Sequence, residues 1–156
     1  MLDPGELSGV DAPSTDVTLE RAEQCPPSLW RALYTTVGRE YHWVDRLGWT
    51  DDEIAAYLGD PALELWVLRE AGAPAGYFEL HKDADGAVEI AYFGLMPGSI
   101  GRGLGKYLLT RAVERAWAWG ATRVWVHTSS LDHSSALPNY LARGFTVWKQ
   151  ETYDVQ

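Results

Sequence analysis

The sequence predicts a mixed α/β domain in which helices flank a central, mostly antiparallel sheet. Residues 63–69, 75–81 and 87–95 are strand-like runs separated by short turn-forming clusters, a pattern typical of an antiparallel meander. A glycine-rich loop leads from the third run into an amphipathic helical segment. Strand-like and helical segments then alternate, and this order indicates a mixed sheet covered by helices.

The first part of the chain predicts one strand and two helices. Residues 16–23 alternate well enough for a strand, and a Pro-Pro pair ends this run. A helix follows to about Val37, with Ser28 as its expected N-cap. A second helix starts after Thr50, which resembles a capping residue, and ends at Gly59.

The last third of the chain completes the order β-α-α-β-β-β-α-β-α-β. A helix is expected over residues 104–119, with Gly120 as its C-terminal cap. Residues 122–127 are β-branched and aromatic enough for a strand. A helix over residues 134–143 and a strand over residues 145–153 follow.

Length and composition favour one domain. The chain has 156 residues, and we assign residues 16–156 to a single domain preceded by a flexible N-terminal arm, residues 1–15. No apolar run approaches the roughly 20 residues of a membrane helix, so no membrane partner is expected. Residues 1–15 lack the basic and apolar regions of a secretory signal, and Cys25 is the single cysteine, so a cytoplasmic location is expected.

Charge and histidine spacing narrow the possible partners. The formal net charge of −9 disfavours binding to a phosphate backbone, so no nucleic-acid partner is expected. The one cysteine and four scattered histidines show no paired ligand spacing, so no metal site is expected.

The glycine-rich loop is the most informative stretch. Gly101, Gly103 and Gly105 alternate where the strand over residues 87–95 passes into the helix over residues 104–119. Glycines allow a tight turn and close approach of a ligand, while the free N–H groups and dipole of a helix N-terminus attract anions. The loop therefore predicts a pyrophosphate site.

Two better-known glycine loops do not fit this spacing. A Walker A loop requires glycine where Ile100 stands and Ser or Thr where Tyr107 stands, and a Rossmann fingerprint requires glycine at Lys106. Arg102 and Lys106 either add positive charge at the rim of the site or are ordinary solvated side chains.

The loop resembles the cofactor motif of the GNAT acetyltransferase superfamily. That motif reads Gln/Arg-x-x-Gly-x-Gly/Ala, and it maps onto Ile100, Gly103 and Gly105. Ile100 departs from the pattern, but the family's residue there acts largely through its backbone amide.

A second family motif lies about 35 residues further on. The form Ala-x-x-x-Tyr-x-x-x-Gly-Phe matches Ala136, Tyr140, Gly144 and Phe145. His133 stands where the family commonly has an Asn that contacts the pantetheine arm, and a histidine can also form a hydrogen bond there.

The resemblance implies a GNAT fold with acetyl-coenzyme A as cofactor. It also implies that the strand over residues 87–95 parts from its neighbour near Phe93, Gly94 and Leu95, where glycine suits a bulge. The expected cofactor-binding residues are Leu95, Met96, Ile100, Gly101, Arg102, Gly103, Leu104, Gly105, Lys106 and His133.

Two catalytic residues are expected from the resemblance. Tyr140 would protonate the departing thiolate, and its alternative role is core packing. Glu89 would be the base, because it precedes Ile100 by the offset at which histone-acetylating members place a catalytic glutamate. Strand alternation would put Glu89, Ala91 and Phe93 on one face. The alternatives for Glu89 are a solvated edge residue, or amine deprotonation through a chain of waters.

Aromatic residues in the first third suggest an acceptor pocket lined by Tyr41, Trp43 and Trp49, although such residues also anchor helices. Three nearby aspartates could receive a cationic amine: Asp45, Asp51 and Asp52.

The expected function is therefore an N-acetyltransferase that moves an acetyl group from acetyl-CoA to a primary amine, directly and within a ternary complex. The acceptor would be a small molecule or peptide, and the protein a monomer or homodimer. A non-catalytic acyl-CoA-binding module is the alternative from another class, and the presence of Tyr140 favours the enzyme. An acyltransferase for a longer acyl group is the third possibility, which depends on the space behind Gly94.

Overall fold

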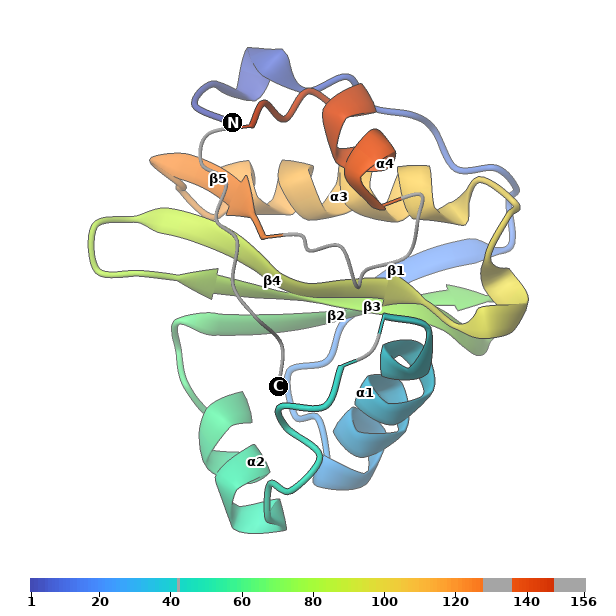
Figure 1. Cartoon of the computed structure of the whole chain (residues 1–156), viewed down its shortest axis with the longest axis vertical. Helices are drawn as coiled ribbons and strands as arrows, with labels where there is room; N and C mark the ends of the chain where they lie inside the picture. Colours follow the sequence, from blue (N-terminus) through green and yellow to red (C-terminus); the bar gives the residue numbers. More distant parts are fainter. Residues whose placement is uncertain (42, 128–135, 148–156) are drawn as a thin grey trace.

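The computed structural model describes residues 1–41, 43–127 and 136–147, and five strands form the central sheet of this part (Figure 1). They lie side by side in chain order, and neighbours pair antiparallel except for the last two, which are parallel. The strands are β1 (Val17–Arg21), β2 (Leu63–Glu70), β3 (Ala73–Lys82), β4 (Ala87–Leu95) and β5 (Arg123–Val126). The helices are α1 (Pro27–Tyr41), α2 (Asp51–Leu58), α3 (Leu104–Ala118) and α4 (Ala136–Ala142), with short 3-10 helices η1 (Pro4–Glu6) and η2 (Pro97–Ser99). The predicted fold class is confirmed.

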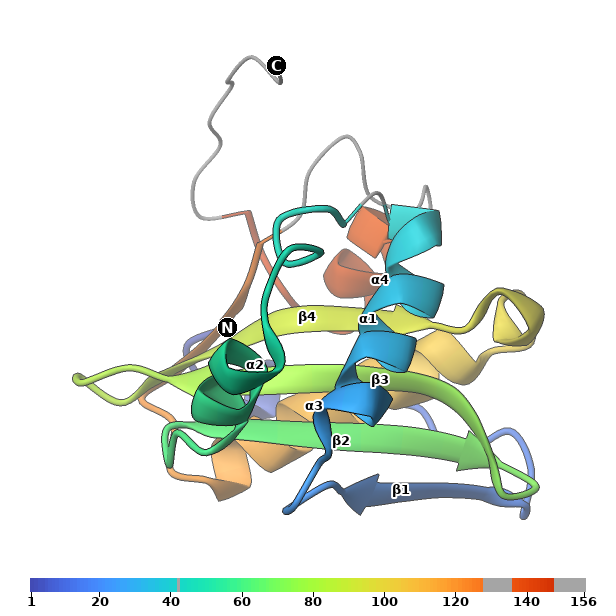
Figure 2. The same ribbon diagram turned by 90° about the horizontal axis from the view of Figure 1, so that it is seen from below.

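Helices cover both faces of the sheet. In Figure 1, α3 and α4 lie on one face, which we call the upper face, and α1 and α2 lie on the lower face. Figure 2 looks at the lower face, with α1 and α2 in front of the strands. Side chains of alternate strand residues point to opposite faces of the sheet, and they pack into two separate cores, one on each face. Large members of the upper core are Leu68, Phe78, Leu80, Val88, Ile90, Leu104, Leu108 and Val124. The lower core contains Trp30, Leu33, Tyr34, Val37, Ile54, Leu65, Val67 and Tyr77.

The first helix begins earlier and ends later than its sequence pattern predicts. Pro27 is its first residue, and the carbonyl of Pro26 accepts the first backbone hydrogen bonds of the helix. Proline suits this position because the N–H that it lacks would have no partner there. Ser28 therefore lies inside α1, and the expectation that it forms the N-cap is wrong. The helix continues past Val37 to Tyr41.

The ends of α2 and α3 agree with their predicted caps. The Thr50 hydroxyl accepts from the Glu53 N–H at 3.2 Å, and the Glu53 carboxylate accepts from the Thr50 N–H at 3.1 Å. These two bonds form the capping box that starts α2. Gly120 follows the end of α3 with φ +92°, a left-handed conformation that favours glycine.

One extra residue in β4 interrupts the regular pairing with β3. Leu80 lies opposite Ile90 and Glu79 lies opposite Tyr92, so Ala91 has no position of its own in the register. This is a β-bulge, and it reverses the alternation of faces along the rest of β4.

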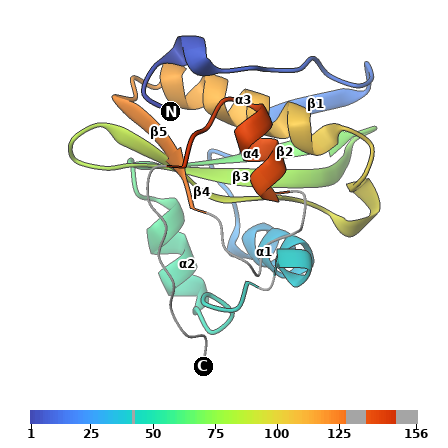
Figure 3. The same ribbon diagram turned by 45° about the horizontal axis from the view of Figure 1, so that its top comes forward.

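The N-terminal segment, expected to be a flexible arm, packs against the upper layer. In Figure 3 it runs along the outer side of α3 before the chain turns into β1. The amino group of Met1 donates to the Val124 carbonyl at 2.8 Å, and the Ser8 N–H donates to the Arg143 carbonyl at the same distance. The segment is thus part of the packed structure rather than a loose extension.

The C-terminal elements are described only in part. The helix expected over residues 134–143 is present from Ala136 to Ala142. Residues 145–147 follow it without strand structure, so the strand expected over residues 145–153 is not formed there. Residues 148–153 lie outside the described residues.

No helix in the described part of the chain is both long enough and apolar enough to span a bilayer.

Candidate functional site

A small pocket lies beside the β4 bulge, where β4 and β5 stop pairing. Within the described residues, the last that pair are Ile90 on β4 and Val126 on β5. The pocket is lined by residues from β4, β5, α4 and the segment that follows α1, and we call it the sheet gap: Trp43, Ile90, Ala91, Phe93, Val126, His127 and Tyr140.

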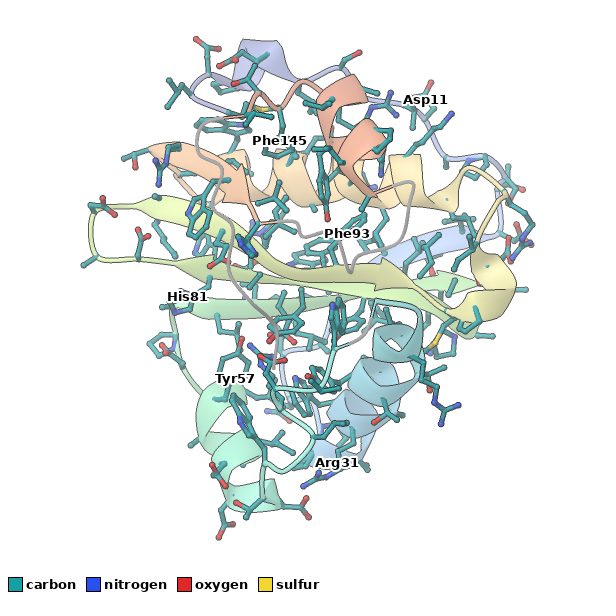
Figure 4. The ribbon with its side chains drawn as sticks, viewed as in Figure 1. Asp11, Arg31, Tyr57, His81, Phe93 and Phe145 are labelled. Atoms are coloured by element: carbon teal, nitrogen blue, oxygen red, sulfur yellow. The ribbon has the colours of Figure 1, made fainter. Side chains whose placement is uncertain are left out.

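The sheet gap is lined from both faces of the sheet. Ile90, Phe93 and Val126 pack with the upper core, and Tyr140 reaches the gap from α4 above. Trp43 packs with the lower core. In Figure 4, the labelled Phe93 lies on the α3 and α4 side, whereas His81 and Tyr57 lie on the other side. The gap therefore connects two faces that the sheet otherwise separates.

Tyr140 is held at the gap by aromatic packing. Its ring is buried and contacts the rings of Phe93 and Phe145 edge-on, each with centroids 6.2 Å apart. This packing fixes the ring, while the residue also borders the sheet gap. Both expected roles of Tyr140, core packing and a catalytic hydroxyl, are compatible with this position.

Glu89 lies on the lower face, near the gap but not among the residues that line it. It pairs with His81 on β3 and with Trp125 on β5. Burial raises the pKa of Glu89, and the nearby His81 and His127 partly oppose that effect. The carboxyl group therefore keeps its proton to a higher pH than an exposed glutamate.

The expectation that Glu89, Ala91 and Phe93 share one face is wrong. The bulge at Ala91 shifts the alternation, so that Phe93 packs with the upper core and Tyr92 with the lower core. Glu89, one residue before Ile90 of the upper core, faces the lower side with Tyr92.

The glycine loop ends in an uncapped helix N-terminus. Gly101 has φ +89°, and Gly103, the N-cap of α3, has φ +81° and no side chain with which to cap the helix. A Cβ atom at either position would meet no other atom within 4 Å, so space is open beside the loop. The first turn of α3 contains no acidic residue. The free N–H groups of this first turn and the helix dipole would favour an anionic ligand.

Asn139 on α4 faces this helix N-terminus. Its Nδ2 donates to the Gly105 carbonyl at 3.2 Å. Its Oδ1 is buried and has no hydrogen-bond partner in the described structure. Buried polar atoms are normally paired, so Oδ1 is suited to accept a hydrogen bond from a ligand between α3 and α4. The residues here fit a ligand with a pyrophosphate and amide groups, as coenzyme A has.

The remaining predicted loop residues differ in what they can offer. Leu95 and Leu104 have side chains in the upper core, so they can contribute only backbone groups. The Met96 N–H already donates to the Ala75 carbonyl, and Ile100 packs against the upper core. Lys106 is exposed beside the helix N-terminus. His133 lies outside the described residues.

Arg102 already has an ionic partner. Its two terminal nitrogens donate to the two carboxylate oxygens of Glu70 at 3.1 and 2.6 Å. This bidentate pair neutralises the charge that Arg102 was expected to add at the rim of the loop.

The aromatic residues of the lower layer surround a cation that belongs to the protein. The Arg46 guanidinium lies 3.8 Å from the ring centroid of Tyr92, 4.5 Å from Tyr57 and 5.0 Å from Trp49. Its Nη1 donates to both oxygens of Glu79, at 2.9 and 3.1 Å, and Glu79 is completely buried. Trp49, predicted to line an acceptor pocket, therefore packs on Arg46.

Two of the three aspartates proposed to receive a cationic amine, Asp45 and Asp51, already have protein partners. Asp45 accepts from the hydroxyls of Tyr34 at 2.8 Å and Tyr92 at 2.6 Å. Burial alone would raise the pKa of Asp45, but these hydrogen bonds, a backbone hydrogen bond and the charge of Arg46 together lower it. Asp51 forms an ion pair with Arg31 at 2.8 Å.

The predicted aromatic residues thus have different places. Trp43 borders the sheet gap, and its ring contacts that of Tyr92 edge-on at 4.9 Å. Trp49 does not line the gap. Tyr41 is the last residue of α1, and its side chain lies outside the described part of the structure.

Sequence reasoning missed four residues around these sites. His127 ends the predicted strand over residues 122–127, and its place beside Glu89 depends on the parallel register of β4 and β5. Asn139 directly precedes Tyr140, which could have drawn attention to it. Glu79 was a visible signal, because it is a lone charge inside an apolar strand, but no sequence pattern connects it with Arg46.

Among residues 1–41, 43–127 and 136–147, no group of three or more His, Cys, Asp or Glu side chains is placed to hold a metal ion.

Comparison with known proteins gives consistent results. The model of the acetyltransferase (GNAT) family matches residues 28–145. Uncharacterized N-acetyltransferases of Mycobacterium tuberculosis and Mycobacterium bovis are 31% identical over 99 residues, which cover 64% of this chain and 63% of each relative. The alignment thus spans less than two thirds of the length of these curated relatives.

Solved acetyltransferases share the fold. An aminoglycoside acetyltransferase from an uncultured soil metagenomic sample, in complex with sisomicin, superposes with a TM-score of 0.72 at 16% identity, over 90% of this chain and 95% of that chain. AAC(6')-Iy, in complex with the bisubstrate analog CoA-S-monomethyl-acetylneamine, superposes with a TM-score of 0.67 at 19% identity, over 91% and 99% of the two chains.

The Arg46–Glu79 pair should dominate the stability of the lower layer. Replacing Glu79 with Gln leaves a buried guanidinium without its counterion, so the free energy of unfolding should fall by about 3–5 kcal/mol in urea denaturation. Glu114→Gln is the matched control, because the exposed Arg111–Glu114 pair should contribute no more than about 1 kcal/mol. A Glu79→Gln protein as stable as the control would contradict this assignment.

Proposed function

The chain belongs to the GNAT acetyltransferase family, and on this premise we propose that it transfers an acetyl group from acetyl-CoA to a primary amine, directly and within a ternary complex. The observation that carries the proposal is the sheet gap. It joins the face that holds the uncapped N-terminus of α3 to the face that holds Trp43 and Glu89. Two substrates approaching from opposite faces could meet there.

The upper face is proposed to hold the cofactor. Acetyl-CoA would supply an acetyl group activated as a thioester. The N–H groups that follow Gly103 would hold its pyrophosphate, and Oδ1 of Asn139 is available to an amide of the pantetheine arm. Lys106 stands close enough to the helix N-terminus to add charge, and His133 remains an expected contact. The backbone of Leu95 and Met96 would border the arm.

The lower face is proposed to receive the amine. Trp43 lines the sheet gap from this side and offers an aromatic ring to an ammonium group. Trp49 and Tyr41 would act further from the gap, and the ring of Trp49 also holds Arg46 in place. Because the related folds include enzymes in complex with an aminoglycoside and an acetylneamine analog, we propose an amine-bearing small molecule or peptide as the acceptor.

Two side chains are proposed to move protons. Tyr140 borders the gap from above and would donate its hydroxyl proton to the departing thiolate. Glu89 lies on the amine side and would take up the proton that the ammonium group must lose before it can attack. The pKa of Glu89, raised by burial, brings this base closer to neutral pH.

Tyr140 at the border of the gap favours an enzyme over a non-catalytic binding module. The direct test is release of free coenzyme A from acetyl-CoA across a panel of amines, including aminoglycosides, polyamines, amino acids and peptides. We expect release that depends on the amine, with the acetylated amine detected by mass spectrometry. Calorimetric binding of coenzyme A without amine-dependent release would instead identify a non-catalytic module.

Gly103 should be essential for binding coenzyme A. An L-residue in its left-handed conformation costs about 1–2 kcal/mol, so Gly103→Ala should turn the N–H groups of the loop away from the phosphates. We expect the affinity measured by calorimetry to fall at least about 10-fold. Gly98→Ala is the control, since a Cβ there also meets open space but Gly98 has no positive φ. Equal affinities of the two variants would disprove the loop assignment.

Tyr140→Phe should separate the hydroxyl from the ring. The ring packing on Phe93 and Phe145 is kept, so Tm and coenzyme A affinity should change little. The value of kcat should fall by about 10- to 1000-fold where protonation of the thiolate limits the rate. Tyr107→Phe, which removes a hydroxyl bonded to Arg111 on α3, should keep the parental kcat. A parental kcat for Tyr140→Phe would leave Tyr140 with a packing role.

A further inference from the structure

His127 is a titratable residue at the sheet gap for which the proposed mechanism gives no role. It directly follows the last residue of β5, it lines the gap together with Tyr140 and Trp43, and it is exposed. A histidine in this position can reach both the gap and solvent, and an imidazole ring can both accept and donate a proton.

The register of the sheet places His127 beside Glu89. Glu89 pairs with Trp125 in the parallel β4–β5 ladder. Val124 and Val126 of β5 belong to the upper core. Because side chains alternate between the two faces of a strand, Trp125 and His127 are directed toward the lower face. His127 therefore lies on the same face as Glu89, two residues beyond the β5 residue with which Glu89 pairs. The electrostatic influence of His127 on Glu89 agrees with this placement.

Glu89 lies further from the sheet gap than His127 does. Glu89 pairs with β5 before the ladder ends, whereas His127 lies past the last pair, Ile90 and Val126, and lines the gap itself. A proton that leaves an amine in the gap would therefore meet His127 before Glu89. The ionisable groups around Glu89 are His81 from β3, His127 after β5, Asp83 from the β3–β4 turn, and Arg46 from the segment after α1.

We propose that His127 is the immediate proton acceptor for the amine and passes the proton to Glu89 or to solvent. This inference rests on the proposed function of the site. The ammonium group of the acceptor gives one proton to a ring nitrogen of neutral His127, and the nitrogen lone pair that this frees can form the new C–N bond. The imidazolium then transfers its proton to the Glu89 carboxylate or to water, which restores neutral His127.

The test compares His127→Ala with His81→Ala. Both histidines are neighbours of Glu89, but His81 lies on β3 and does not line the gap. With an amine that the parent acetylates, His127→Ala should lower kcat/KM at least about 100-fold near neutral pH. The loss should shrink as pH rises, because more of the amine is then already deprotonated. His81→Ala should keep most of the activity, and a loss equal to that of His127→Ala would overturn the proposal.

Two further measurements separate proton transfer from a structural effect. Added imidazole should restore part of the rate of His127→Ala but not that of His127→Gln, whose side chain still fills the site. Equal loss at every pH without rescue by imidazole would assign His127 a structural role. In the free protein, NMR titration of the Glu89 carboxyl carbon should show a higher pKa for Glu89 in His127→Ala, because a nearby positive charge is lost. An unchanged midpoint would mean that the two side chains do not interact, and would overturn the transfer of a proton between them.

The outcomes distinguish this inference from the proposed function. A parent protein that acetylates no amine removes both. An active parent whose His127→Ala variant keeps the parental kcat/KM and pH profile overturns the role of His127 alone.

Discussion

The end of pairing between β4 and β5 is the constraint on which the candidate site depends. A parallel ladder that ran the full length of β4 would close the sheet and keep the two layers apart. The ladder stops instead at Ile90 and Val126, and the bulge at Ala91 follows immediately. Because a bulge bends its strand and shifts its side chains, the same feature opens the gap and decides which β4 residues face each layer. Tyr140 and His127 are placed at the site by that opening.

An internal cation joins the elements of the lower layer to one another. Arg46 is held by the buried carboxylate of Glu79 and lies among the rings of Trp49, Tyr57 and Tyr92. An aromatic cage of this kind could bind a ligand cation, but here the guanidinium already occupies it. We therefore expect the acceptor to be recognised by Trp43, the residue of the aromatic cluster that lines the gap. This network connects Arg46, which precedes α2, to Glu79 on β3 and to Tyr57 on α2.

The parts of the structure that depend on local sequence were predictable. The turns between β2, β3 and β4, the capping box at Thr50 and the glycine after α3 all follow from residues close together in the chain. The bulge was expected near Phe93, Gly94 and Leu95 but lies at Ala91, because its position is set by pairing with β3 rather than by the glycine. The face of Phe93 was predicted wrongly for the same reason. The partners of Arg46 and the neighbours of His127 were also inaccessible, since both depend on which strands and loops meet in space.

The bidentate pair between Arg102 and Glu70 has a consequence for how an anionic ligand reaches the glycine loop. With this guanidinium neutralised, the attraction at the loop comes from Lys106 and from backbone dipoles, which act only over the first turn of the helix. At longer range, the field is set by the net charge of −9, which repels a polyanion such as coenzyme A. Raising the ionic strength screens that repulsion more than it weakens the short-range contacts. Association of the cofactor should therefore become faster with added salt, the opposite of the behaviour of a site steered by exposed arginines.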